Sequence, residues 1–347
     1  MGEWCPRLPV KVTPNEWRTM VALTRAWTLR EVARIGGLPV STVHRILRRL
    51  YSKGLVYFMV DMRKVNLLPM VAVFPKHRVD RAPPFTVSVR EVYNMGTHVL
   101  VTGLVPPPFT NDYLAWFDRE PIIAVRGYEY VRWTPESPLS RYDPGLRAVV
   151  PVFELEKALE ACRGPVERWD RGLAAPDVYD LVLLQGRMRD PFARPLKIYK
   201  EARARDPSLP DASEQVLSYH FTRHLKAMWR GNTAIVFADM RVVPVRVFYF
   251  EGKDAPALAK ALCMLPGAFG AVIEPRRALL IAQFPCSYDE HVMRAADGLD
   301  VEMPYYFVQS SSSIMRVMPR LWRYVEDGRW VFREELSVPV VRVAPKR

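Results

Sequence analysis

A segment near the N-terminus places hydroxyl, imidazole and guanidinium side chains where they can contact nucleic acid. These polar side chains fall on one face of a predicted helix: Ser41, Thr42, His44, Arg45, Arg48 and Arg49. The opposite face is apolar and carries Val43, Ile46, Leu47 and Leu50. Arginine binds phosphates and guanine edges, and short hydroxyl side chains contact either backbone or bases. We expect Ser41, Thr42, His44 and Arg45 to face base edges. We expect Arg48, Arg49, Arg63 and Lys64 to contact phosphates or the groove wall.

A pair of histidines, His220 and His224, has the spacing of a metal-binding or acid–base pair. Four residues apart on a helix, the two side chains share a face. Histidines that pack in or beside a helix core are far more common. No third ligand, nucleophile with a partner base, or phosphate-binding glycine loop is apparent. The four cysteines, Cys5, Cys162, Cys263 and Cys286, are too widely spaced for a zinc ribbon. We therefore expect no catalytic residues, no metal and no cofactor.

The composition favours a polyanionic partner. The 347 residues include 50 Lys and Arg against 37 Asp and Glu, which leaves a formal charge of +13. Arginine supplies 39 of the 50 basic residues, and this bias, with the 31 prolines, is also typical of a thermophile. No apolar run approaches the roughly 18 residues that span a bilayer, and the N-terminus lacks a secretory signal. We expect a cytoplasmic protein with no membrane partner.

The elements that position the polar helix are predicted to form a winged helix-turn-helix over residues 1–62. Thr28 and Glu31 have the spacing of a capping box, and Gly36-Gly37 ends the short helix that they start. The predicted order is a helix from Thr13 to about Ala26, the short helix, the polar helix ending at Gly54, and a strand from Leu55 to Val60. This order of elements is typical of a winged helix-turn-helix.

A second pattern, over residues 241–310, predicts a ferredoxin-like domain with the order βαββαβ. The strands are expected at Val242–Phe250, Phe269–Glu274, Ala278–Phe284 and Val301–Val308. Asp254 is expected to cap the first helix, and Ser287 with Glu290 to form a capping box for the second. The element lengths fit a two-layer sandwich of helices on a sheet.

The chain also repeats itself at a nearly constant offset, which indicates duplication. Gly54 and Gly231 each end a basic helix, and Asp61-Met62-Arg63 recurs as Asp239-Met240-Arg241. A second, divergent helix-turn-helix is therefore expected at 176–240, with a long charged turn in place of Gly-Gly. Its nucleic-acid-binding residues would be Thr222, Arg223, Lys226 and Arg230.

Three further segments complete the predicted organisation. Residues 63–134 form a degenerate ferredoxin-like domain whose first helix is reduced to the proline-broken stretch 76–84, and residues 135–175 form a linker with one helix. Residues 311–347 form a basic aromatic extension, since arginines interleaved with aromatics can stack on bases. The binding residues expected there are Arg316, Arg320, Arg323, Arg342, Lys346 and Arg347. A docked helix and strand with solvated arginines is the alternative for this extension.

A winged helix followed by Asp61-Met62-Arg63-Lys64-Val65, a strand and a ferredoxin-like domain resembles the Lrp/AsnC (feast/famine) regulators of archaea and bacteria. Those proteins are dimers whose helices bind DNA and whose α/β domains pair and can bind amino acids. The resemblance implies an α+β fold in which duplicated winged helix-turn-helix and ferredoxin-like units form an intrachain pseudo-dimer. It also implies a DNA-binding transcription regulator with a small-molecule effector.

Two alternatives remain open at this point. Winged helices also bind RNA, so an RNA- or ribosome-binding factor, such as an inhibitor of translation, can be built on the same fold. The two differing recognition faces and the basic extension favour an irregular partner of that kind. A remote alternative is an enzyme, because siroheme decarboxylases resemble fused winged-helix and ferredoxin-like units and Tyr219-His220 and His224 invite the comparison.

Overall fold

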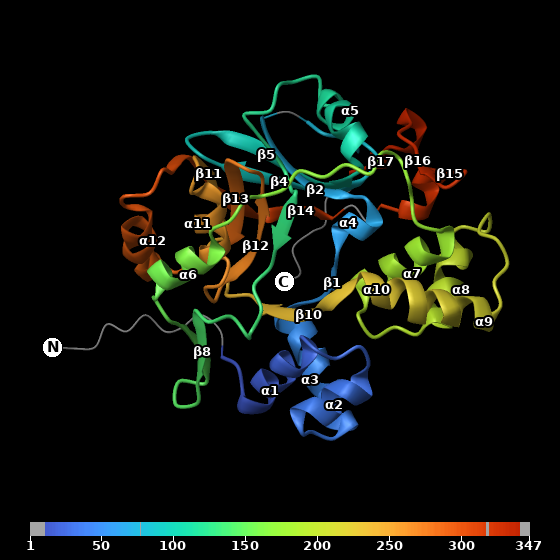
Figure 1. Ribbon diagram of the computed structural model, residues 1–347, viewed down its shortest axis with the longest axis horizontal. Helices are drawn as coiled ribbons and strands as arrows, with labels where there is room; N and C mark the ends of the chain where they lie inside the picture. The colour runs from blue at the N-terminus through green and yellow to red at the C-terminus, as the bar shows by residue number, and fades with distance from the viewer. Residues whose placement is uncertain (1–10, 77, 317–318, 341–347) are drawn as a thin grey trace.

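Three helices and a strand open the computed structural model (Figure 1), which describes residues 11–76, 78–316 and 319–340. Thr13 and Thr28 each accept a hydrogen bond at the start of a helix, and Glu16 and Glu31 complete the two capping boxes. The elements of this N-terminal unit are α1 (Pro14–Leu23), α2 (Leu29–Gly36), α3 (Val40–Lys53) and β1 (Gly54–Val60). The predicted N-terminal helix-turn-helix is confirmed, although α1 ends three residues earlier than expected.

A second helical unit leads into strand β10, which pairs antiparallel with β1. A Cβ atom on Gly54 would lie 1.9 Å from the carbonyl oxygen of Ile235, so the strands meet where only glycine fits. The last helix before β10 contains a π-helical stretch, His220–Leu225. The elements are α7 (Val178–Arg189), α8 (Pro195–Arg205), α9 (Glu214–Tyr219), α10 (Lys226–Met228) and β10 (Trp229–Val236). The β1–β10 pair joins the two helical units (Figure 1).

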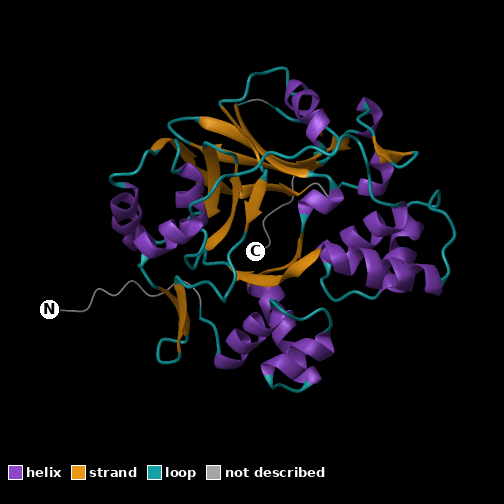
Figure 2. Cartoon of the chain, viewed as in Figure 1, coloured by secondary structure: helices purple, strands orange, loops and turns teal. Residues whose placement is uncertain are grey.

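An antiparallel sheet of nine described strands fills the upper part of the view in Figure 2, with the order β6-β2-β5-β4-β14-β11-β13-β12-β7. Its first half comprises β2 (Leu68–Pro75), β4 (Thr86–Tyr93), β5 (Thr97–Val105) and β6 (Ile123–Arg126). The second comprises β11 (Arg246–Glu251), β12 (Ala268–Ile273), β13 (Arg277–Ala282) and β14 (Glu302–Arg316). In each half, the strands lie in the spatial order fourth, first, third, second. The halves meet where β14 continues from β11 onto β4.

The far end of the sheet repeats this junction. Strand β7 (Glu129–Val131) follows β6 in the chain after Gly127 and Tyr128, and it pairs with β12 of the second half. The last stretch of the first half therefore forms two separate strands, β6 on β2 and β7 on β12. The two junctions correspond. In the second half, β14 pairs first with β11 and then with β4 of the other half. In the first half, β6 pairs with β2, and its continuation β7 pairs with β12 of the other half.

Alternation along the strands gives the sheet two differently covered faces. Side chains from both halves, among them Val73, Leu100, Val247, Leu279 and Phe307, form a shared apolar cluster. In the second half, the other face is covered by α11 (Ala255–Leu262) and α12 (Asp289–Ala296), and α6 (Leu155–Cys162) of the predicted linker packs on α11. In the first half, the stretch corresponding to α11 forms only β3 (Arg81–Ala82), and α5 (Thr110–Ala115) is the helix between β5 and β6.

The C-terminal extension packs against the first half and the second helical unit. Leu321, Tyr324 and Trp330 are buried in the same apolar cluster as Phe85 and Leu181. The extension contains β15 (Val325–Glu326), β16 (Arg329–Trp330) and β17 (Val338–Pro339), and β17 pairs with β3. This arrangement agrees with the docked alternative for the extension, because its aromatic side chains lie in the core.

Two local predictions are wrong. The last strand of the second half does not end at Val308, because β14 continues through the serine run after Gln309 and pairs with β4 as far as Arg316. Ser287 and Glu290 form no capping box: α12 is entered through a 3-10 turn, Cys286–Tyr288, and no described side chain caps it. In the described ranges, no helix has the length and apolar character needed to cross a membrane.

Candidate nucleic-acid interface

The turn between α2 and α3 is built by local interactions. Thr28 and Glu31 cap the start of α2, and Glu31 also accepts a hydrogen bond from the N–H of Trp27 at 2.6 Å. Gly37 ends α2 with φ of +60°, a left-handed conformation that strains any residue with a Cβ. The N–H of Leu38 then donates to the carbonyl oxygen of Ala33 at 3.0 Å. These contacts hold α3 at a defined angle to α2.

The apolar face of α3 anchors the helix as the sequence predicts. Val43, Ile46, Leu47 and Leu50 are buried, each at most 5% exposed. On the opposite face, Ser41, His44, Arg45, Arg48 and Arg49 are exposed and Thr42 is half-buried. No described carboxylate lies within ion-pair distance of Arg45 or Arg48. Both guanidinium groups therefore face solvent and can bind an external anion.

Arg49 differs from its neighbours because it is held by a buried carboxylate. Its Nε lies 3.6 Å from Oε1 of Glu16, and Nζ of Lys53 lies 3.1 Å from the same oxygen. Burial opposes ionisation of Glu16, but the hydrogen bond from the Thr13 N–H and the Lys53 ammonium outweigh it and lower the pKa of the carboxyl. Glu16 thus stays charged and ties α3 to α1. Arg49 is less available to phosphate than Arg48.

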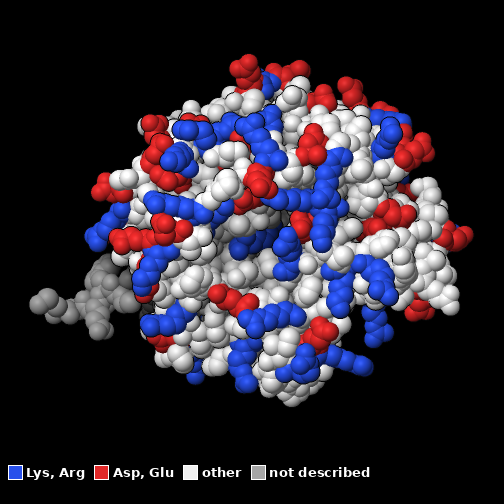
Figure 3. Space-filling model, in the orientation of Figure 1, with Lys and Arg blue, Asp and Glu red and all other residues white. Residues whose placement is uncertain are grey.

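The start of α3 is also open to an anion. Pro39 stands at the cap position, and no described side chain accepts from the first N–H groups of the helix. Unsatisfied N–H groups at a helix start carry partial positive charge and favour phosphate. Lys and Arg side chains are spread over the lower face of the molecule, where α1 to α3 lie (Figure 3). The electrostatics of this face suit a polyanion.

Sequence reasoning missed two arginines on α2. Arg30 and Arg34 are exposed and lie four residues apart on that helix. In helix-turn-helix proteins, the helix before the recognition helix crosses the DNA backbone. The i, i+4 spacing of these arginines was the signal that could have identified them as phosphate contacts.

The remaining predicted residues of the helical units gather elsewhere. Arg63 and Lys64 lie on α4 (Met62–Val65), at the far end of β1 from α3, and seven strand residues span about 20 Å. Nζ of Lys64 donates to the carbonyl oxygen of Ala227 at 2.7 Å. Their neighbours belong to the second helical unit, where Thr222, Arg223, Lys226 and Arg230 are exposed. Arg230 forms an ion pair with Asp61 at 2.6 Å. The structure does not bring this group to the α3 face.

Two of the six predicted residues of the extension, Arg320 and Arg323, are engaged within the chain. Nε of Arg323 lies 2.7 Å from Oδ2 of the buried Asp206, and Trp322 donates to the same oxygen at 3.0 Å. The hydrogen bond from Arg323 is the main cause that holds the pKa of Asp206 far below its usual range. Arg320 donates to the carbonyl oxygen of Arg205. The Arg316 side chain, Arg342, Lys346 and Arg347 lie outside the described residues. The long charged turn around Asp206 thus binds the described part of the extension.

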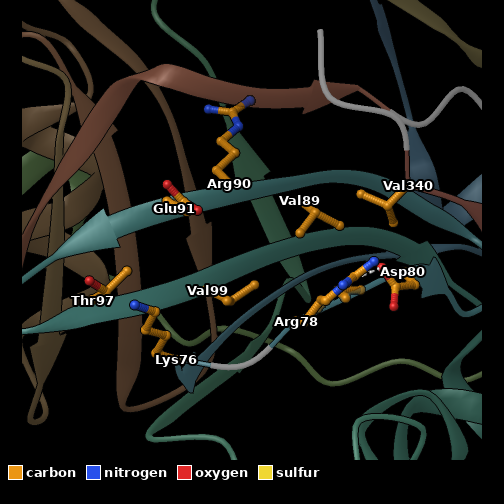
Figure 4. A pocket seen from close by; sticks show the side chains of 10 residues that line it. Lys76, Arg78, Asp80, Val89, Arg90, Glu91, Thr97, Val99 and Val340 are labelled. Carbon is orange, nitrogen blue, oxygen red and sulfur yellow. Dashed lines mark hydrogen bonds and ion pairs between the residues drawn. The ribbon is translucent and has the colours of Figure 1, made fainter.

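One cavity of small-molecule size lies beside β4 and β5 (Figure 4). Its volume is about 720 Å³, and its lining mixes charged residues with valines. The charged residues are Lys76, Arg78, Asp80, Arg90 and Glu91. The cavity adjoins the stretch where the first half of the sheet has no counterpart of α11.

Within the described part of the chain, one group of side chains could hold a metal ion: Asp180, His220 and His224. Asp180, on α7, is the third group that the sequence did not reveal. No local signal could have identified it, because it precedes the histidines by 40 and 44 residues.

Comparison with known proteins identifies the N-terminal unit. Residues 21–58 match the model of the IclR helix-turn-helix domain, over the end of α1, all of α2 and α3 and most of β1. No curated protein matches the chain. A solved structure, the crystal structure of the siroheme decarboxylase NirDL, aligns over 85% of this chain and 90% of that chain, with 13% identity and a TM-score of 0.40. At that score the likeness does not establish a common fold. Residues 21–58 are thus similar to an IclR-type helix-turn-helix domain, and this match supports a DNA-binding regulator.

Proposed function

We propose that this protein is a transcription regulator that reads double-stranded DNA with α3. The observation that carries the proposal is the exposed polar face of α3 within a matched helix-turn-helix domain. Ser41, Thr42, His44 and Arg45 lie in the N-terminal half of the helix, which enters the major groove in such domains. Arg48, with Arg30 and Arg34 on α2, contacts phosphates on either side of the groove.

We further propose that the chain is a duplicated, Lrp/AsnC-like pseudo-dimer of helix-turn-helix and ferredoxin-like units. The identical strand order of the two sheet halves supports it, as does the antiparallel pairing of β1 with β10. The repeated tripeptides also fold alike. Asp61 accepts from the N–H of Arg63 and Asp239 from the N–H of Arg241, at 3.2 and 3.0 Å.

The second helical unit differs from the first in ways that favour a supporting role in DNA binding. Its third helix contains the π-helical stretch, and its inter-helix turn receives the extension. Thr222, Arg223 and Lys226 remain exposed, and we assign them to a separate, weaker contact with the DNA backbone. A small-molecule effector would bind in the cavity beside β4 and β5, whose volume lies within the usual range for such sites.

The test is crosslinking in the native cells, followed by sequencing of the attached nucleic acid. We expect a narrow set of promoter fragments that share a sequence. The double variant Arg45→Ala/Arg48→Ala should lose this enrichment. The matched control Arg294→Ala removes an exposed helical arginine on α12 and should retain it. Recovery of ribosomal RNA at fixed positions in place of promoters would overturn the regulator and favour the RNA-binding alternative.

A further inference from the structure

Asp180, His220 and His224 converge at the junction of α7 with the π-helical stretch. Asp180 lies in the first turn of α7 and is only 4% exposed. Nδ1 of His220 lies 2.8 Å from its Oδ1, and Nδ1 of His224 lies 3.0 Å from its Oδ2. One potential ligand atom from each of the three side chains lies within 4.8 Å of the other two. Two imidazoles and a carboxylate thus point at one small volume.

The backbone holds the histidines in this arrangement. His220 begins the π-helical stretch and His224 is its fifth residue, and their ring centroids are 4.8 Å apart. Leu217 and Leu225, on either side, are fully buried and fix the helix against α7. Single π-helical turns are rare and often occur at functional sites.

The cluster opens onto a cavity of about 370 Å³. Asp180 and His224 line it, together with Asn66, Lys64 and Arg223. Asn66 is 3% exposed, and its Nδ2 donates to the carbonyl oxygens of Gly172 and Ala174. Its buried Oδ1 has no hydrogen-bond partner among the described residues. The cavity gives an ion a path to the cluster and leaves room for a further ligand.

We propose that Asp180, His220 and His224 bind a divalent first-row transition metal ion of the zinc class. Two imidazoles with one carboxylate, and a position left open for a fourth ligand, match the donor set of such sites. Tetrahedral ligand atoms about 2.0–2.2 Å from zinc lie roughly 3.3 Å apart. The nitrogen–oxygen separations of 2.8 and 3.0 Å approach this value.

Metal binding changes the protonation of the imidazoles. In the metal-free protein each Nδ1 lies in hydrogen-bond contact with Asp180. When the ion binds at Nδ1, a neutral imidazole takes the tautomer protonated at Nε2, and an imidazolium releases one proton. Lys64 and Arg223 add positive charge to the cavity wall, which disfavours a bare cation and favours an anion as the fourth ligand. The ion would fasten α7 to the helix that carries Thr222 and Lys226.

The experiment uses the full-length chain without a histidine tag, stripped with a chelator and titrated with Co²⁺ and then Zn²⁺. We expect one Co²⁺ per chain with ligand-field absorption bands, displaced by Zn²⁺. His224→Ala and Asp180→Asn should abolish both the bands and the stoichiometric binding. His44→Ala, an exposed histidine of α3, is the matched control and should bind as the wild type does.

His224 is the residue to replace because its side chain is 38% exposed. Its truncation should leave the core intact, so a loss of metal binding would not reflect unfolding. The wild type should gain thermal stability on adding Zn²⁺, and His224→Ala should not, because an ion that binds only the folded state stabilises it. No stoichiometric binding to the wild type, or equal binding to His224→Ala, would overturn the proposal. The readout needs no DNA, so it is independent of the regulator's own test.

Discussion

Replacing Arg45 and Arg48 separately tests whether α3 binds DNA, because we expect the two arginines to contact different parts of the DNA. Both are exposed and face no described carboxylate, so each truncation removes one available positive charge and little packing. Arg48 is assigned to a phosphate and Arg45 to a base edge. The affinity from a phosphate contact comes from counterion release and depends on salt. The affinity from a base contact comes from hydrogen-bond geometry and depends on the DNA sequence.

The expected magnitudes follow from the three exposed phosphate contacts on this face, Arg30, Arg34 and Arg48. These three contacts contribute about −2.7 to the slope of log K against log salt, or about a 40-fold loss of affinity between about 50 and 200 mM salt, to which Arg223 and Lys226 add. Arg48→Ala should make the slope less steep by about 0.9 and reduce that loss by about 3.5-fold. Arg45→Ala should instead cost about 1–3 kcal/mol on the cognate sequence, roughly 5- to 150-fold, with an unchanged slope.

Fluorescence anisotropy over a salt series measures both quantities, on the duplex recovered by crosslinking and on a scrambled duplex. Arg45→Ala should bring the two duplexes closer in affinity, whereas Arg48→Ala should weaken both alike. Arg294→Ala lowers the net charge equally from a distant helix and should leave slope and specificity in place. If Arg294→Ala changes the slope as much as Arg48→Ala does, the α3 face is not the DNA-binding surface.

Three predictions concern stability. Glu16→Gln retains a residue able to complete the capping box but loses the charge that pairs with Lys53, and should cost about 1–2 kcal/mol at pH 7. Because the pKa of Glu16 is lowered on folding, its contribution exists above the ordinary value of 4.5 and disappears as the pH falls through the folded-state pKa. Gly54→Ala, whose Cβ would overlap the carbonyl oxygen of Ile235, should cost about 3 kcal/mol or more in thermal denaturation. Trp330→Ala, which empties a fully buried site, should cost about 3–5 kcal/mol and release the extension to proteases.

Each of these has a control or a contrary result. The difference in free energy of unfolding between wild type and Glu16→Gln should become smaller in acid. A difference that stays constant down to low pH would show that the charge of Glu16 contributes nothing to stability. Gly145→Ala, whose Cβ would meet only a side-chain atom at 3.3 Å, should be nearly neutral beside Gly54→Ala. Unchanged protease sensitivity of Trp330→Ala would show that the extension is held by other contacts.

The helix-turn-helix could be predicted because its signals are local. Thr28 and Glu31 are three residues apart, Gly37 follows directly, and the buried positions of α3 recur every three or four residues. Such interactions are satisfied within one or two helical turns, so the sequence alone displays them. The second sheet half was predicted for the same reason, since its strands are short apolar runs bounded by turn residues.

The contacts that sequence reasoning missed join residues far apart in the chain. Asp206 and Arg323 are separated by 117 positions, and Asp180 and His220 by 40. A charged turn and an arginine-rich extension each suggest solvated surface when viewed separately. The structure shows that Arg323 pairs with Asp206 and that the described part of the extension packs as a structural element.

Arg187 is a buried contact between the two helical units. Its side chain is 2% exposed and lies among Trp27 of the first unit, Phe58 of β1 and Phe221 of the π-helical stretch. Nη2 donates to the carbonyl oxygen of Trp27 at 2.9 Å, and burial lowers the pKa of the guanidinium to about 10, so it remains charged at neutral pH. Loss of a partner of a buried charge is costly, because the charge is then left uncompensated. The Arg187 guanidinium therefore ties Phe221 of the π-helical stretch to Trp27 of the unit that carries α3.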